Sequence, residues 1–161
     1  MKTKDVALYG ILLVLALMLS YVEALLPLSF TIPGIKLGLP NIVVLFVLYR
    51  LGFKSACTVS LLRVALSSLL FGNVMSLAYS LAGAVLSLAV MGLLKKCGKF
   101  SHAGVSVAGG VAHNAGQILV AMALLETAEI GYYLPVLCVT GTVAGIFVGL
   151  TAALLLKRVK A

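Results

Sequence analysis

The sequence predicts an all-α fold, an integral membrane bundle of six transmembrane helices that forms a single domain over residues 1–161. Hydrophobic residues make up 63% of the chain and charged residues only 10%, whereas soluble domains are about 45–50% apolar and about 25% charged. The apolar residues form long runs, and most basic residues lie in every second connection between the runs and at the two ends of the chain. This composition excludes a soluble enzyme, a disordered chain and a conventional nucleic-acid-binding protein.

Six apolar runs follow one another with short polar breaks. A spanning helix needs about 20 residues, within a range of about 17–25, and the second and third runs fall short of it. The second run also begins with Pro40 in its first turn. Strands of a membrane barrel would alternate polar and apolar residues, and these runs do not. The expected spans are residues 6–26, 37–51, 56–71, 74–94, 103–125 and 132–156.

The charges predict the orientation of the bundle. With six spans, all twelve basic residues except Lys36 and Arg63 lie on one side, which also holds both termini. The opposite side carries Glu126 and Glu129, with Lys36 as its only base. Cytoplasmic loops of membrane proteins are enriched in Lys and Arg. Both termini are therefore expected in the cytoplasm.

Motifs for catalysis and metal binding are missing from the sequence. Asp5 is the only aspartate, so no Asp-rich motif can hold Mg²⁺ and a diphosphate. The three cysteines, Cys57, Cys97 and Cys138, have neither metal-ligand nor redox spacing. The lysine-rich run from Gly92 resembles a phosphate loop, but its glycines are one residue too far apart. We therefore expect no enzyme activity, no metal, no cofactor and no nucleic-acid partner.

Two charged residues fall within the predicted spans. Arg63 lies in the middle of the third, and Glu23 lies near the outer end of the first. A charge inside a membrane is costly and is a functional candidate by default, and arginine cannot lose its proton. Either Glu23 forms a structural ion pair with Arg63, or Arg63 awaits an anionic ligand.

Neutral polar residues gather in the fifth span and in the connection before the second. His113, Asn114 and Gln117 place three hydrogen-bonding side chains within five residues, and either core packing or ligand binding accounts for them. The apolar segment from Pro27 to Asn41 is long for a connection between helices. It is either a lid that points Lys36 into the outer mouth of the bundle or an ordinary interfacial loop.

Small residues recur every four positions in two spans, which allows helices to approach closely. Such a face either packs inside the bundle or docks a partner membrane protein. In the sixth span these residues are Gly141, Gly145 and Gly149, and in the first they are Ala16, Ser20 and Ala24.

Four segments carry a resemblance to the bacterial heptaprenyl diphosphate synthase component I family, also called the Gx transporter family. They are PGIKLGLPN from Pro33, SLLRVALSSLLFG from Ser60, SLAYSLAGAVLSLAVMGLL from Ser76 and GVSVAGGVAHNAGQILVA from Gly104. The resemblance implies a bacterial plasma membrane protein. The family is similar to the substrate-binding S components of energy-coupling factor transporters, which are six-helix bundles with both termini inside. In these components the first outer loop caps the ligand site, and small residues of the first span meet a coupling subunit.

These inferences together predict a transporter subunit that takes up a small, anionic ligand from the outer face. Lys36 and Arg63 would neutralise the ligand, and Asn41, His113, Asn114 and Gln117 would supply hydrogen bonds. Ala16, Ser20 and Ala24 would dock a transmembrane coupling subunit that works with ATPases. One alternative is a non-catalytic membrane subunit linked to heptaprenyl diphosphate or quinone synthesis, with catalysis in a partner. The other is a membrane component of flavin-based extracellular electron transfer, because the family also occurs in such loci.

Overall fold

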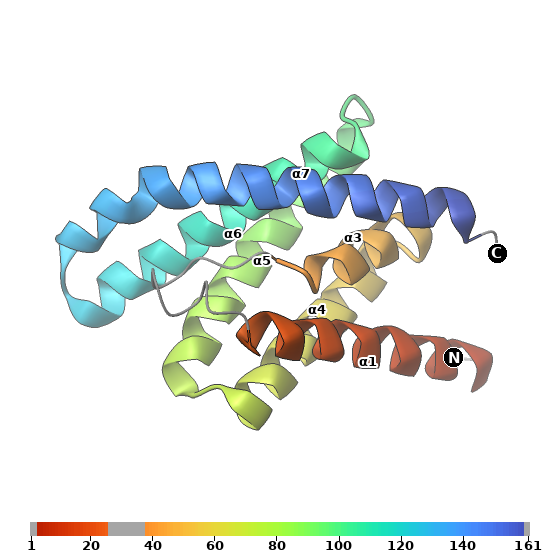
Figure 1. Ribbon diagram of the computed structural model, residues 1–161, viewed down its shortest axis with the longest axis horizontal. Coiled ribbons are helices and arrows are strands. Elements are labelled where there is room, and N and C mark those ends of the chain that lie inside the picture. Colours follow the sequence, from red (N-terminus) through yellow and green to blue (C-terminus); the bar gives the residue numbers. More distant parts are fainter. Residues whose placement is uncertain (1–2, 26–37, 160–161) are drawn as a thin grey trace.

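The computed structural model describes residues 3–25 and 38–159, and this part of the chain is helical throughout, without a β-strand. The helices cross one another in one bundle (Figure 1). A short 3-10 helix, η1 (Ala128–Tyr133), precedes the last of them. In chain order the others are α1 (Thr3–Leu25), α3 (Asn41–Arg50), α4 (Phe53–Phe71), α5 (Val74–Cys97), α6 (His102–Leu125) and α7 (Leu134–Arg158).

Five of the helices in the described residues, α1, α4, α5, α6 and α7, are long and apolar enough to cross a membrane. The helix at the third expected span is longer than the apolar run 56–71, because α4 already begins at Phe53 and covers 19 residues. The second expected span is shorter, because α3 has only ten residues. At 1.5 Å per residue α3 is about 15 Å long, about half of a hydrocarbon core.

The late start of α3 has a local cause. Gly38 has φ +68°, a left-handed conformation that turns the chain, and Pro40 follows at the N-cap. Proline fixes its own φ and lacks an N–H group, so it fits the start of a helix rather than its interior. The backbone N–H of Asn41 donates to the carbonyl of Gly38 at 2.8 Å, which closes the turn. The second element is therefore a turn followed by a half-length helix.

The basic residues gather at one end of the bundle. Arg50 Nη2, at the end of α3, donates to the carbonyl of Val159 after α7 at 2.7 Å. Lys95 Nζ, at the end of α5, donates to the carbonyl of Leu48 at 2.5 Å. The N-terminus of α1 and the C-terminus of α7 also lie on the same side of the molecule (Figure 1). Arg50, Lys95 and the ends of α1 and α7 thus share one end of the described structure.

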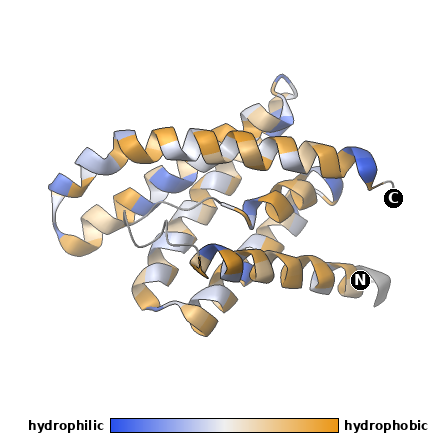
Figure 2. Cartoon of the chain, in the orientation of Figure 1, coloured by the Kyte–Doolittle hydropathy of each residue, from blue (hydrophilic) through white to orange (hydrophobic). Residues whose placement is uncertain are grey.

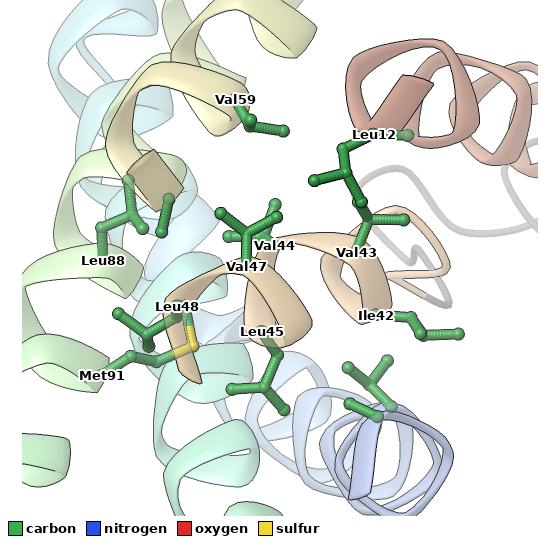
Figure 3. Packing of buried hydrophobic residues seen from close by; sticks show 14 of the residues in the cluster. Leu12, Ile42, Val43, Val44, Leu45, Val47, Leu48, Val59, Leu88 and Met91 are labelled. Carbon is green, nitrogen blue, oxygen red and sulfur yellow. The ribbon is translucent and has the colours of Figure 1, made fainter. Parts of the chain in front are cut away.

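The hydrophobic core surrounds α3, which carries the largest fully buried side chains of the described chain. Val44, Leu45, Val47 and Leu48 are each at most 1% exposed. Figure 3 shows residues of α3 packed toward Leu12 of α1, Val59 of α4, and Leu88 and Met91 of α5. The short helix is therefore covered by its neighbours, and its apolar residues serve the interior rather than lipid.

Large apolar side chains cover the outside of the longer helices. Leu69 is 78% exposed and Val74 81%, and α1 and α7 carry similar residues along their outer faces. Hydrophobic residues predominate along α1 and α7, and the C-terminal end of α7 is hydrophilic (Figure 2). Such a surface suits lipid rather than water, so the chain has the exterior of a multi-pass membrane protein.

Candidate functional site

A polar cavity of about 340 Å³ lies inside the bundle, and all six of the longer elements α1, α3, α4, α5, α6 and α7 contribute to its wall. A ligand cavity in a protein typically measures about 300–1,000 Å³, so this one suits a compact molecule. The ionisable and amide side chains on its wall are Glu23, Asn41, Arg63, Asn73, His113 and Asn114.

On the side of α1 and α3, Glu23 is tied to the turn that precedes α3. The carboxylate oxygen Oε1 of Glu23 accepts a hydrogen bond from the backbone N–H of Gly38. A Cβ atom on Gly38 would lie 3.2 Å from Nδ2 of Asn41, so the turn, the carboxylate and the amide are close neighbours. Glu23 is 7% exposed. The contact places an acidic group and an amide on one wall of the cavity.

On the side of α4, Arg63 is 8% exposed and lines the same cavity. Its Nε atom is buried and has no hydrogen-bond partner among the described residues. The charge of Glu23 acts on the guanidinium from nearby. A buried cation normally finds both a counter-charge and hydrogen-bond acceptors. Glu23 supplies the opposite charge here, while the Nε–H group of Arg63 can still donate a hydrogen bond.

On the opposite wall, α6 presents His113 and Asn114. The ring of His113 lies against Gly83 of α5, where a Cβ would come within 2.9 Å of Cε1 and Nε2. Asn114 Nδ2 donates to the carbonyl of Leu137 at 2.6 Å. This bond fixes the orientation of the amide, because only the NH₂ group can donate to a carbonyl. The Oδ1 atom of Asn114 is then the acceptor that the amide can offer to the cavity.

Serines complete the polar wall. None of them was predicted to bind ligand, Ser20 was expected only in the small-residue stripe of the first span, and Asn73 was not predicted either. The signal was nevertheless present, because α5 carries Ser76, Ser80 and Ser87 on one face at helical spacing. The serines that line the cavity are Ser20, Ser67, Ser68, Ser76, Ser80, Ser87 and Ser106.

The start of α5 is held by a local motif at the rim of this wall. Asn73 Oδ1 accepts from the backbone N–H of Ser76 at 2.8 Å, and the Ser76 hydroxyl accepts from the N–H of Asn73 at 3.2 Å. This capping box satisfies two backbone donors at the helix start. It fixes the point at which α4 turns into α5.

The structure brings together five of the residues predicted to serve the site, namely Glu23, Asn41, Arg63, His113 and Asn114. Gln117 is buried, with 9% exposure, but is not on the cavity wall, and its Oε1 has no hydrogen-bond partner among the described residues. Lys36, and most of the segment considered as a lid, lie outside the described residues.

In the small-residue stripe of α1, Ala16 and Ser20 face the inside of this chain and Ala24 is exposed, so the docking surface expected from the sequence stays a prediction. Ala16 is fully buried and Ser20 is 8% exposed. Ser20 and Ala24 both line the cavity. The outer face of α1 instead presents large side chains such as Ile11 and Met18. A partner that reaches α1 from outside would therefore meet those residues rather than Ala16 or Ser20.

The glycine stripe of α7 lies against α6. A Cβ on Gly145 would come within 2.6 Å of the Cα of Val107, and one on Gly149 within 2.6 Å of the Cα of Ala103. A Cβ on Gly141 would meet Nδ2 of Asn114 at 2.8 Å. The spacing of these glycines indicates close helix approach, and α6 and α7 do approach backbone to backbone.

The fold and the cavity define a class: a multi-pass helical membrane protein built around an internal polar cavity. Within that class the chain belongs to the heptaprenyl diphosphate synthase component I family, whose model matches residues 12–155. No curated protein and no solved structure matches the chain. The family name denotes one component of a synthase and implies association with a partner component.

Proposed function

We propose that this chain is a small-molecule-binding subunit of a membrane transporter, which takes up an anionic ligand from the outer face and passes it inward. The observation that carries the proposal is Arg63, a buried cation on the wall of the cavity whose Nε atom has no hydrogen-bond partner among the described residues. Such a group inside a membrane protein is a default functional candidate. An anionic group of a ligand would complete its hydrogen bonding.

The other side chains of the wall have roles that follow from their positions. Asn41, His113 and Asn114 would hydrogen-bond the ligand, and Glu23 would balance the charge of Arg63 when the cavity is empty. The chain carries no nucleotide-binding motif, so energy for transport would come from a coupling subunit with ATPases. The basic end and both termini would lie in the cytoplasm of a bacterium, with the chain in its plasma membrane.

Native mass spectrometry of the full chain, purified in mild detergent, tests the proposal. We expect an anionic small molecule to remain bound to the wild type and to be reduced at least about tenfold in Arg63→Gln, because hydrogen bonds to charged groups contribute about 1.5–3 kcal/mol. Arg50→Gln is the matched control, since Arg50 is exposed at the basic end. A ligand retained equally by all three proteins would refute the role of Arg63.

The family name favours a second candidate, a non-catalytic membrane subunit in heptaprenyl diphosphate or quinone synthesis. This role predicts a prenylated molecule in the cavity and stable association with a partner that carries the catalytic Asp-rich motifs. The same mass measurement separates the two candidates, because a prenyl or quinone mass supports the second. Co-purification of a soluble synthase with the tagged chain would support it further.

A further inference from the structure

The chemistry of the cavity wall indicates which class of ligand it accepts. We infer that the ligand is a compact hydrophilic anion that also carries a hydrogen-bond donor, such as a hydroxyl or amine, and that a polyprenyl chain is excluded. This inference rests on the proposed function and specifies its substrate class. It depends on three features of the cavity, namely its size, the hydroxyl groups on its wall, and the hydrogen-bonding groups of Arg63 and Asn114 on that wall.

The size of the cavity sets the first limit. The volume of about 340 Å³ lies near the lower end of the range of about 300–1,000 Å³ that ligand cavities occupy. A cavity of this size suits a compact molecule better than an extended chain of seven five-carbon units.

The wall sets the second limit, because its hydroxyl groups need hydrogen-bonding partners. Ser20 donates to the carbonyl of Ala16 at 2.9 Å, and Ser76 donates to the carbonyl of Asn73 at 3.0 Å. These two hydroxyls therefore already have partners. An apolar chain would instead remove water from the buried serines of the wall, Ser68, Ser87 and Ser106, and a buried hydroxyl left without a partner costs about 1–3 kcal/mol. A ligand with its own polar groups, or with bridging waters, avoids this cost.

The third feature is the presence of a donor and an acceptor on the same cavity wall. Arg63 brings its charged guanidinium to the wall from α4, and an anionic oxygen is the strongest acceptor for its N–H groups. The amide of Asn114 is oriented by its bond to Leu137, so its Oδ1 atom can accept from the ligand. One molecule that meets both groups must carry an anionic group and a donor. Hydroxy acids, amino acids and sugar phosphates have this combination.

Two extracts of the producing cells serve as probes, an aqueous metabolite extract and an organic lipid extract. Each is incubated with the detergent-purified full chain, and the thermal midpoint of unfolding and the bound mass are measured. We expect only the aqueous extract to raise the midpoint and to add a hydrophilic mass, with at least a tenfold loss of that mass in Arg63→Gln but not in Arg50→Gln. Stabilisation by the lipid extract alone would overturn the substrate class but leave ligand binding intact. Stabilisation by neither extract would overturn the proposed function as well.

A labelling measurement covers the case in which Arg63→Gln fails to fold. Ser80 is partly exposed on the cavity wall, and Ser80→Cys can be placed in a chain whose native cysteines at 57, 97 and 138 are replaced by alanine. Rates are measured with anionic sulfonatoethyl and cationic trimethylammonioethyl methanethiosulfonates, each normalised to its rate with a small thiol in solution. We expect the anionic reagent to react about tenfold faster when Glu23→Gln is also present, because the charge of Arg63 is then no longer balanced. Equal rates, a preference for the cation or no labelling would contradict a water-filled cavity that attracts anions.

Discussion

The two halves of the cavity wall are built in opposite ways. Helices α5, α6 and α7 meet through glycines, and α6 and α7 approach so closely that a Cβ on Gly145 would lie 2.6 Å from the backbone of Val107. Helices α1, α3 and α4 instead contribute Glu23, Arg63 and the turn at Gly38. The glycine half gains stability from contact between backbones, and the charged half places costly groups around open space. The hydrophobic effect does not hold helices together inside a membrane. The close contacts of the glycine half therefore have to support the costly groups of the charged half.

The largest effect is expected in the glycine half. Gly145→Ala forces a methyl group against the backbone of α6, which cannot rotate away as a side chain can. We expect the free energy of unfolding to fall by about 1–3 kcal/mol, the usual cost of overpacking. Chemical unfolding in mixed micelles measures this change.

Gly10→Ala is the matched control for this glycine. Gly10 lies in the middle of a helix, and no heavy atom is within 4 Å of its virtual Cβ. Alanine is favoured over glycine in a helix interior by about 0.5–1 kcal/mol, so we expect equal or greater stability. A similar loss in both variants would mean that α6 and α7 are not in close contact.

The charged half is tested next by coupling between its two charges. Because Glu23 acts electrostatically on Arg63, removing either charge withdraws a favourable electrostatic interaction from the other buried charge. We expect Glu23→Gln and Arg63→Gln each to destabilise the chain, and the double variant to cost about 1–2 kcal/mol less than their sum. Unfolding free energies of the four proteins give this coupling energy. Strict additivity would mean that the two residues are independent.

The turn at Gly38 should give a smaller effect on stability and a specific effect on binding. An alanine at φ +68° costs about 1 kcal/mol or somewhat more, and it would disturb the N–H group that Glu23 holds. Gly52→Ala is the control, because Gly52 also has a positive φ but has open space around it and does not line the cavity. We expect both variants to lose stability and only Gly38→Ala to lose the bound ligand in native mass spectrometry. Equal retention of the ligand by Gly38→Ala and Gly52→Ala would mean that the turn at Gly38 does not contribute to ligand binding.

Hydrophobic runs predicted the helices well because lipid leaves few alternatives to a helix. Five of the six expected spans are within a few residues of the observed helices in the described chain. The run from Leu37 to Leu51 was less reliable, because apolarity alone does not distinguish a helix that faces lipid from a half-length helix surrounded by protein. Gly38 and Pro40 carried that information through backbone geometry rather than hydropathy.

Polar residues within apolar runs predicted five of the six ionisable and amide side chains on the cavity wall, because each is too costly to face lipid. The direction of a small-residue stripe was not predictable in the same way. Alanine, serine and glycine permit close approach from either side, so the stripe of Ala16 and Ser20 indicated a contact without showing that it lies inside this chain.

Gln117 gives the smallest expected effect and tests how far the site extends along α6. It was predicted to bind ligand together with His113 and Asn114, yet its side chain is buried away from the cavity wall. Replacing a buried polar group that lacks a partner by an apolar group of similar shape is nearly neutral or stabilising. We therefore expect Gln117→Met to raise the free energy of unfolding by up to about 1 kcal/mol and to leave the bound ligand unchanged.

The opposite result would mean that the ligand site extends along α6 as far as Gln117. A Gln117→Met variant that keeps its stability but loses the ligand more than about tenfold would place its Oε1 atom in contact with ligand, at a cost of about 1.4 kcal/mol in binding. Such a contact requires α6 to turn or shift relative to α5, where Gly116 lies so close that a Cβ would come within 2.8 Å of the carbonyl oxygen of Ala82. Binding would then have to open part of the glycine half, so stability and ligand binding would be linked through the same helix contact.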